Sequence, residues 1–199
     1  SIRYECRVTE VSQNGDGVTV RVDTPGEIEE TMSDYLIGCD GSRSVVRKSI
    51  DVEFEGLTYP EQFVIASVSE PIDEIVPDMG HVAYISHPKE WCALIHAPDF
   101  WRFMYPIPVD MTQEEAFEDE FLQQRLKRLV PYEGHYSTNH LSMYAVNQRV
   151  AKCYRRGRVL LAGDSAHVNN PLGGMGMNGG IHDGIILAEK LVQILNHGA

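Results

Sequence analysis

Cysteine and long apolar runs are both scarce in this sequence of 199 residues. None of its four cysteines forms a C-x-x-C pair, so we expect reduced thiols rather than disulfides at Cys6, Cys39, Cys92 and Cys153. No stretch approaches the roughly 20 apolar residues that a membrane-spanning helix needs, and no signal peptide is evident. The sequence therefore predicts a cytoplasmic protein with no membrane span.

Positive charge is scarce as well. Lysine and arginine number 17 against 29 aspartates and glutamates, which gives a net charge of −12. Such a surface repels phosphates, so the charge balance argues against nucleic acid or an anionic membrane as a partner. Hydrophobic residues make up 43% of the chain, as in a globular protein with one sizeable core or two small ones.

The most informative stretch is 157–183, GRVLLAGDSAHVNNPLGGMGMNGGIHD. Residues 159–162 predict a short buried strand that ends at Gly163-Asp164, and a glycine-rich loop then leads into a helix from about Asn178. Glycines let a backbone approach a ligand closely, and the free N–H groups at a helix start attract negative charge. This order of elements is typical of a site for a polyanionic cofactor.

Residues 174–179 of this loop also spell G-x-G-x-x-G. A dinucleotide fingerprint needs a strand immediately before the first glycine and an acidic residue about 20 positions further on. The predicted strand ends well upstream of the first glycine, and no acidic residue stands at that distance. We therefore reject a dinucleotide fingerprint here.

A second strand-end turn lies within residues 35–47, YLIGCDGSRSVVR. A short apolar strand runs into Asp40-Gly41, and a helix is predicted to start near Ser44. From the residues alone, Asp40 fits a helix cap as well as it fits a ligand site.

Both stretches resemble motifs of the flavoprotein aromatic hydroxylases, the family of para-hydroxybenzoate hydroxylase and the ubiquinone-pathway hydroxylases. The longer one is similar to the family pattern G-R-v-x-L-x-G-D-A-A-H, P-x-G-G-x-G-M-N, g-i-x-D, and departs from it at Ser165 and Met175. The shorter one is similar to G-x-D-G-x-x-S-x-v-R. The two motifs occur in the order that the family has.

The resemblance implies that FAD is the cofactor and that these two stretches bind it. In the family, the Asp-Gly pair lies near the pyrophosphate, the later aspartate binds the ribityl-pyrophosphate part, the proline lies beside the isoalloxazine, and the helix start faces the flavin N1–C2 edge. The residues that correspond here are Asp40, Gly41, Gly163, Asp164, Pro171, Gly173, Gly174, Gly176, Met177 and Asn178.

The resemblance also implies an enzyme, an FAD-dependent monooxygenase. In the family, NAD(P)H reduces the flavin, which forms a C4a-hydroperoxide that hydroxylates a small aromatic substrate. A reductase, halogenase or epoxidase of the same superfamily stays an alternative, as does a non-catalytic flavin- or partner-binding module. The N-terminal G-x-G-x-x-G unit of the family is missing, so we expect a C-terminal segment of a longer enzyme that is inactive alone. Homodimerisation is left open.

No residue is assigned to catalysis or to a metal. His167 belongs to the longer motif, but a lone histidine beside a glycine loop is more often structural than catalytic. His135 and His140 do not have the spacing of metal ligands on a helix.

The expected fold class is α+β. Residues 1–50, with a β meander and the Asp-Gly motif, and residues 151–199 are predicted to form a partial FAD/NAD(P)-binding α/β domain. Residues 51–150 are predicted to form a substrate domain, an antiparallel sheet with one helix over 112–130 that Thr112 and Glu115 cap. The apolar pattern of the last helix predicts that it is buried.

Candidate substrate contacts come from the resemblance. Tyr84 precedes a His87-Pro88 turn similar to one in para-hydroxybenzoate hydroxylase that supplies a substrate-contacting tyrosine, and Met104 would add an apolar wall. Aligned through that turn, the serine and arginine that hold the substrate carboxylate correspond to Ile95 and to Ala97, which cannot pair with a carboxylate. The sequence therefore predicts a neutral or more apolar aromatic substrate, or a carboxylate bound by another residue such as Arg102.

Overall fold

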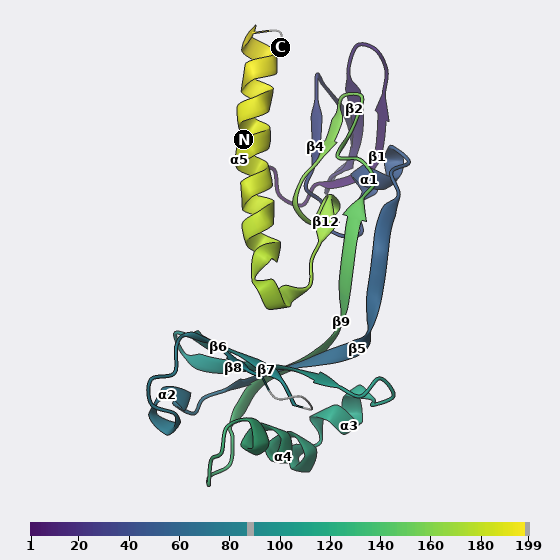
Figure 1. The fold of residues 1–199 in the computed structure, drawn as a ribbon. Helices are drawn as coiled ribbons and strands as arrows, with labels where there is room; N and C mark the ends of the chain where they lie inside the picture. Colours follow the sequence, from purple (N-terminus) through teal and green to yellow (C-terminus); the bar gives the residue numbers. More distant parts are fainter. Residues whose placement is uncertain (87–89, 198–199) are drawn as a thin grey trace. The chain divides into compact units, whose positions relative to one another are not determined.

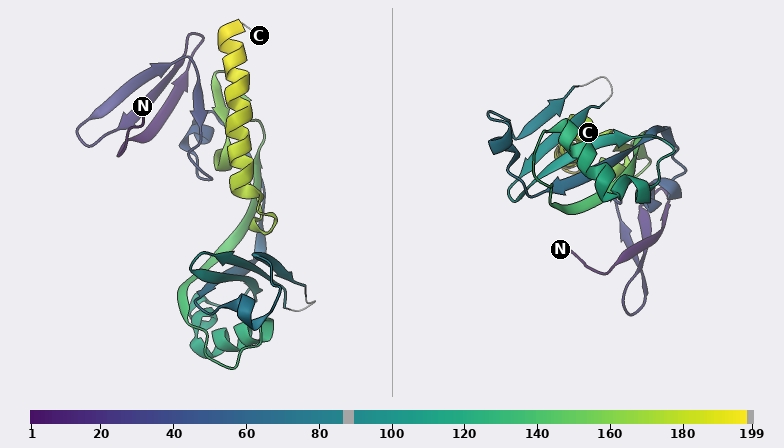
Figure 2. Two further views of the ribbon diagram at one scale, coloured as in Figure 1. Left: turned by 90° about the vertical axis from the view of Figure 1, so that its left-hand side faces the viewer. Right: turned by 90° about the horizontal axis from the view of Figure 1, so that it is seen from below.

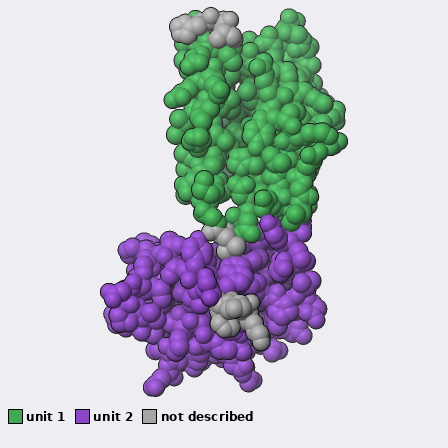
Figure 3. Space-filling model, in the orientation of Figure 1, with its two compact units in different colours: residues 1–57, 147–199 green, residues 58–146 purple. Residues whose placement is uncertain are grey.

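The chain is divided into two compact units. The structure, a computed structural model, describes residues 1–86 and 90–197, apart from the side chains of Leu172 and His197. Unit 1 consists of residues 1–57 and 147–199, and unit 2 of residues 58–146 (Figure 3). Unit 1 is therefore built from two separate segments of the sequence, whereas unit 2 is continuous.

Unit 1 begins with an antiparallel meander of three strands, β1 (Arg7–Gln13), β2 (Val18–Asp23) and β3 (Ile28–Ser33), which Figure 2 shows as two successive hairpins. The alternating valines of β2 bury Val18 and Val20 in the core of the unit. The turn between β1 and β2 is closed by Asn14, whose side-chain oxygen accepts hydrogen bonds from two backbone amides. The meander predicted from the sequence is confirmed.

A second small sheet of unit 1 has the order β10-β11-β4. Its strands are β10 (Arg155–Arg156), β11 (Val159–Leu161) and β4 (Leu36–Gly38), and β11 runs parallel to β4. Helix α1 (Val45–Ser49) follows β4. The core of unit 1 joins this sheet to the meander and α1 through apolar residues that include Val11, Val46, Ile50, Val159 and Leu161.

After β11 the chain makes a 3-10 turn η1 (Gly163–Ser165), a short strand β12 (His167–Val168), a second turn η2 (Pro171–Gly173) and helix α5 (Met175–His197). Helix α5 is the long helix of unit 1 in Figure 1. It begins three residues before the predicted start, so the last glycines of the loop belong to its first turns. The N-terminal amides of α5 therefore lie directly after η2.

The prediction that α5 is buried is wrong for this chain. Ile181, Ile185, Val192 and Leu195 are between 55% and 62% exposed. The apolar residues of α5 extend around more of its circumference than unit 1 covers, because the helix meets the unit along one side only. On that side, a recess of about 210 Å³ remains between the helix and β11, lined by Leu160, Leu161, Ile186, Leu187 and their neighbours.

Unit 2 contains most of a six-stranded sheet of order β12-β9-β5-β8-β7-β6. Its strands are β5 (Phe54–Val68), β6 (Val82–Ile85), β7 (Cys92–Ala97), β8 (Phe100–Ile107) and β9 (Thr138–Ala151). Strand β5 pairs antiparallel with β8, β8 with β7, and β7 with β6. The chain passes between the units along β5 and β9. The α+β class that the sequence predicted is confirmed.

Three short helices accompany this sheet, α2 (Ile72–Ile75), α3 (Gln113–Phe117) and α4 (Asp119–Leu129). The single helix predicted over 112–130 is therefore wrong. Thr112 and Glu115 form the expected capping box, but the backbone leaves the helical region at Glu118, with φ −58° and ψ 131°. The Glu118 carbonyl then accepts the first hydrogen bond of α4, from Leu122 N.

The sheet of unit 2 has two different faces. Helices α3 and α4 cover the first face (Figure 1), where Val64, Leu94, Phe103 and Tyr105 meet Leu126 of α4 in the core. The second face carries the residues that alternate with these along each strand, among them Tyr84, Ala93, Ile95, Arg102 and Met104. No helix that the structure describes in residues 1–86 and 90–197 is long and apolar enough to cross a membrane. All four cysteines carry free thiols.

We expect the isolated chain to self-associate, because α5 exposes a row of large apolar side chains. Replacing Ile185 and Val192 by lysine should shift sedimentation toward the monomer and reduce the binding of an apolar dye. The matched control replaces Glu189 and Gln193, exposed on the same helix, by lysine and should change charge without removing apolar area. A chain that sediments as a monomer at every concentration, with no dye binding, contradicts this prediction.

Candidate functional site

Two predicted turns meet at one edge of the small sheet in unit 1. Leu161 of β11 stands opposite Gly38 of β4 in the parallel pair, so both strands end at the same level. Asp40 follows the end of β4, and Asp164 follows the end of β11. In sheets with parallel strands, ligands commonly bind beyond the carboxyl ends of the strands. The fold therefore brings together two motifs that are far apart in the sequence.

Ser165 and Arg47 hold the two turns to each other. The buried Ser165 hydroxyl donates to the Gly38 and Ala162 carbonyls. Arg47 is 4% exposed, and its guanidinium donates to the Ser165 carbonyl at 2.9 Å and to the Ser42 carbonyl at 2.7 Å. Burial lowers the pKa of Arg47, and the nearby Asp40 carboxylate opposes that shift. Arg47 thus joins the turn after β4 to the turn after β11.

The contacts of Asp40 are those of a helix cap. Its carboxylate accepts hydrogen bonds from the Ser44 hydroxyl at 2.5 Å, from Val45 N at 2.7 Å and from Val46 N at 3.1 Å. These are the amides at the start of α1, so the carboxylate already occupies donors that an anionic phosphate would need. Gly41, with φ +83°, gives the turn a left-handed conformation that favours glycine. In this turn, the backbone around Gly41 is therefore a better candidate for a ligand contact than the Asp40 carboxylate.

Asp164 has a different environment. Its side chain is exposed and has no hydrogen-bonding or ionic partner within the described part of the chain. It lies in η1, directly after Gly163, whose φ of +60° turns the backbone toward α5. A free carboxylate at the end of a strand can accept hydrogen bonds from hydroxyl groups of a ligand.

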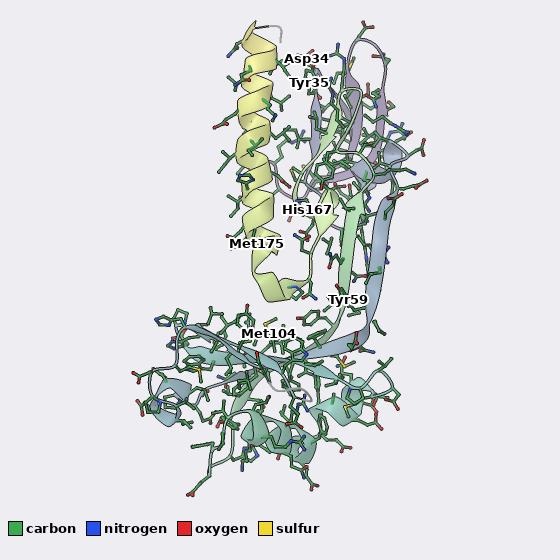
Figure 4. All side chains as sticks on the ribbon, viewed as in Figure 1. Asp34, Tyr35, Tyr59, Met104, His167 and Met175 are labelled. Atoms are coloured by element: carbon green, nitrogen blue, oxygen red, sulfur yellow. The ribbon has the colours of Figure 1, made fainter. Side chains whose placement is uncertain are left out.

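Asp183 fastens α5 to this turn. Its Oδ2 accepts a hydrogen bond from Gly163 N at 2.9 Å and lies 2.8 Å from His167 Nε2. His167 is labelled in Figure 4 and lies on β12, between α5 and β9. A Cβ added to Gly180 would come 3.4 Å from the Gly163 Cα, so glycine permits the close approach of helix and turn. His167 therefore has a structural partner.

The start of α5 presents backbone donors. Gly173 ends η2, and Gly174 has φ +62°. Gly176 and Met177 lie in the first turn of the helix, where amide N–H groups have no partner within the helix. Asn178 comes next, and its side-chain Nδ2 donates a hydrogen bond to the Gly174 carbonyl at 2.8 Å. The first turn contains no acidic residue, so its positive dipole end is not neutralised. Together with the exposed Pro171 of η2, this segment can bind an anionic or carbonyl oxygen group.

The predicted substrate residues lie in unit 2 and share the second face of its sheet. Tyr84, Ala93 and Met104 form one cross-strand row, which Ile65 of β5 continues. Ile95 lies in the next row, opposite Arg102. Met104 is 6% exposed and Tyr84 56% exposed; Figure 4 shows Met104 on the side of the sheet away from α4. The His87-Pro88 turn, on which the alignment of Ile95 rests, lies outside the described residues.

An aromatic group that the sequence did not single out lies on the same face. The Phe63 ring is 5.4 Å from the Trp91 ring and 6.0 Å from the Tyr144 ring, measured between centroids. Burial raises the pKa of Tyr144, and its hydroxyl is a buried group without a hydrogen-bonding partner among the described residues. An apolar face that carries such a hydroxyl can contact a flat ring and one polar substituent.

Sequence reasoning also missed the roles of Arg47, Ser165 and Asp183. All three lie inside the two quoted motifs, as polar positions among the glycines and apolar residues. A search for polar residues in those motifs that are not themselves in the ligand loop would have found them. Among the described residues, no group of three or more His, Cys, Asp or Glu side chains could hold a metal ion.

The whole chain is similar to known flavoproteins. Residues 1–199 match the protein family described as FAD binding domain. The chain is 35% identical over 203 residues to a para-nitrophenol 4-monooxygenase of Pseudomonas sp. (strain WBC-3), which covers 100% of this chain and 49% of that protein. It is 32% identical over 196 residues to a 3-(3-hydroxy-phenyl)propionate/3-hydroxycinnamic acid hydroxylase of Mycobacterium sp. (strain JLS), covering 98% of this chain and 34% of that one.

Solved structures show the same likeness. The crystal structure of p-nitrophenol 4-monooxygenase from Pseudomonas putida DLL-E4 superposes with a TM-score of 0.88 at 33% identity, over 99% of this chain and 50% of that one. A ternary complex of aklavinone-11 hydroxylase with FAD and aklavinone gives a TM-score of 0.81 at 28% identity, over 96% and 37% of the two chains. The chain thus spans between a third and a half of the length of these relatives.

We expect Asp183→Ala to lower the free energy of unfolding by about 1–3 kcal/mol, because Gly163 N–H and His167 lose their acceptor. Asp183→Asn keeps one acceptor oxygen and should lose less. The measurement is urea unfolding followed by circular dichroism. Glu189→Ala, an exposed acid of the same helix, is the control and should leave stability unchanged. Equal free energies of unfolding for the Asp183→Ala and Glu189→Ala variants would show that the contacts of Asp183 do not stabilise the fold.

Proposed function

We propose that this chain is part of an enzyme that hydroxylates a small aromatic substrate. The chain belongs to the family described as FAD binding domain. Its relatives named above include a monooxygenase and a hydroxylase of aromatic compounds. Unit 1 carries the cofactor site and unit 2 the substrate face. The observation that carries the proposal is that unit 1 contains both an exposed Asp164 carboxylate and a helix start, that of α5, with no acidic residue in its first turn.

The residues of unit 1 fit FAD by their chemistry. The cofactor has hydroxyl groups on its ribityl chain, and the Asp164 carboxylate can accept their hydrogen bonds. It also has carbonyl and phosphate oxygens, for which the backbone amides of Gly176 and Met177 are donors, whereas the amide of the predicted Asn178 is the first to be bonded within α5. Glycines at the loop and at the turns let the backbone approach a large ligand without side-chain obstruction.

When bound, the flavin would supply the redox chemistry, by accepting electrons from NAD(P)H and activating dioxygen. The protein would hold the flavin in position and polarise it. The positive end of the α5 dipole favours negative charge close to the first turn of the helix. Arg47 and Asp183 keep the turn after β11 in place. Use of NAD(P)H and a cytoplasmic location belong to this proposal, and the number of subunits in the enzyme is left open.

The second face of unit 2 supports an aromatic substrate. Met104, Ala93 and Ile65 offer an apolar row, and the rings of Phe63 and Trp91 lie on the same face. Apolar contacts of this kind can bind a flat ring but do not fix its orientation. Neighbouring polar groups therefore decide which ring substituents are accepted. The named relatives act on a nitrophenol and on a hydroxyphenyl-propionate, both single aromatic rings.

We expect Asp164→Ala to weaken FAD binding by the full-length protein about 10- to 100-fold, since a charged acceptor is lost. The measurement is flavin absorbance retained by the purified protein at limiting FAD, together with NAD(P)H oxidation. Asp23→Ala, an exposed aspartate of the meander in the same unit, is the control. Full occupancy in the Asp164→Ala variant would remove Asp164 from the cofactor site.

We expect Met104→Ala to raise the KM for simple phenols about 5- to 30-fold, because it removes apolar contact from the row where the ring is proposed to lie. Met104→Leu keeps the volume and should change KM little. Tyr84→Phe tests whether the tyrosine hydroxyl contributes. The assay measures NAD(P)H oxidation and hydroxylated product across a panel of phenols and benzoates. Unchanged kinetics in both Met104→Ala and Tyr84→Phe would contradict this assignment of the substrate face.

A further inference from the structure

Unit 2 contains a recess beside α2 that the proposed function does not use. It holds about 280 Å³ and is lined by the residues that follow β5, by α2 and by the hairpin between β7 and β8. Four of its lining residues are acidic, Glu70, Asp73, Glu74 and Asp99. The lining residues that the structure describes include no lysine or arginine. The recess therefore concentrates negative charge within one unit.

Glu70 differs from the other three acidic residues because it is buried. It is 9% exposed, whereas Asp73, Glu74 and Asp99 are exposed. Its Oε1 accepts a hydrogen bond from Ser137 N at 2.8 Å, and its Oε2 is a buried atom with no hydrogen-bonding partner among the described residues. A buried carboxylate is unfavourable unless a partner neutralises it. Oε2 thus indicates a donor that a ligand in the recess can supply.

The groups around Glu70 leave its charge unneutralised. The Tyr136 hydroxyl donates to the Val130 carbonyl at 2.8 Å, so its proton is not available to the carboxylate. Burial raises the pKa of Tyr136, and the negative charge of Glu70 adds to that shift. Within the described ranges of the chain, no basic side chain forms an ion pair with any of the four carboxylates. A cation is therefore missing from this site.

The recess also has aromatic lining residues, which other contacts hold in place. The His96 ring stacks on the Trp101 ring, with centroids 4.4 Å apart and an interplanar angle of 0°. Trp101 Nε1 donates to Asp73 Oδ1 at 3.3 Å, and His96 Nδ1 lies 3.0 Å from His81 Nδ1. Aromatic rings attract cations, and a planar cation can stack on them. The lining thus suits a cation with a flat face.

The arrangement of the carboxylates favours an organic cation over a metal ion. A hard metal ion such as Ca²⁺ needs several oxygen ligands that converge on one point. Among the described residues, no group of three or more His, Cys, Asp or Glu side chains could hold a metal ion, so the carboxylates of the recess do not converge in this way. A guanidinium group instead carries five N–H donors on a planar fork and can pair with separate acceptors.

We propose that this acidic recess binds the guanidinium group of a ligand, with the Glu70 Oε2 as its buried acceptor. The exposed carboxylates of Glu74 and Asp99 attract the cation from solution. An alkylguanidine and an arginine side chain of a polypeptide both carry this group, and the experiment separates these two sources. The inference goes beyond the proposed function and does not depend on it.

The experiment compares two ligands of nearly equal shape, butylguanidinium and neutral butylurea, by calorimetric titration of the full-length protein at low ionic strength. We expect butylguanidinium to bind at least about 10-fold more tightly than butylurea. Glu70→Gln keeps an acceptor for Ser137 N but removes the charge, so it should weaken butylguanidinium at least about 10-fold and leave butylurea unchanged. Glu74→Gln and Asp99→Asn, at exposed positions, should each weaken butylguanidinium about 2- to 5-fold.

Glu114→Gln is the matched control, because Glu114 is an exposed glutamate of the same unit that does not line the recess. It should leave both affinities unchanged. Equal affinities of the wild type for the two ligands, or a Glu70→Gln variant that binds butylguanidinium as tightly as the wild type, overturn the proposal. Should Glu70→Gln not fold, the double variant Glu74→Gln/Asp99→Asn decides, and an unchanged affinity for butylguanidinium then overturns it.

Two further titrations identify the source of the cation. A short peptide with blocked ends and one arginine that binds at least as tightly as butylguanidinium assigns the recess to a side chain of a polypeptide, whereas binding of butylguanidinium alone assigns it to a small molecule. Displacement of butylguanidinium by calcium chloride, where sodium chloride of equal ionic strength has no effect, shows a metal site and overturns the proposal. None of these titrations measures flavin binding or turnover, so a negative result leaves the proposed function standing.

Discussion

The parallel pairing of β4 with β11 is the constraint on which the proposed cofactor site depends. It aligns the ends of two strands from opposite parts of the sequence, and the buried Arg47 then fixes the turn after one to the turn after the other. Asp183 extends this arrangement to α5 through Gly163. The position of the helix start relative to Asp164 is therefore determined by a few hydrogen bonds to backbone atoms, which leaves the exposed carboxylate and the helix amides free to contact a ligand.

Unit 2 has its core on one face of its sheet and the proposed substrate contacts on the other. The face under α3 and α4 contains the large core residues, so it holds the unit together. The second face also carries polar atoms that do not stabilise the unit by hydrogen bonding, since the Ser67 Oγ and the Arg102 Nε have no hydrogen-bonding partner in the part of the chain that the structure describes. A charged side chain without a partner is unfavourable for folding, and a core of this size on the opposite face offsets that loss.

The sequence predicted local features better than distant contacts. The strand, turn and helix order within 157–183 follows from apolar pattern and glycine positions, and the capping box at Thr112 from two residues three apart. The break at Glu118 did not follow, because the apolar stripe continues through it. The exposure of α5 could not be predicted either. An apolar pattern predicts that a helix is buried, but it does not show which part of the protein covers it. The contact of Arg47 with Ser165 depends on long-range pairing that no local pattern encodes.

The division of unit 1 into two segments has a consequence for biosynthesis. During translation, residues 58–146 emerge complete before residues 147–199 exist, so unit 2 can acquire its native contacts while unit 1 still lacks β11 and α5. Unit 1 must then close a long loop, but a folded unit 2 brings the ends of that loop together along the adjacent strands β5 and β9. A mutation that delays the folding of residues 58–146 should therefore reduce the yield of folded unit 1, although none of those residues belongs to it.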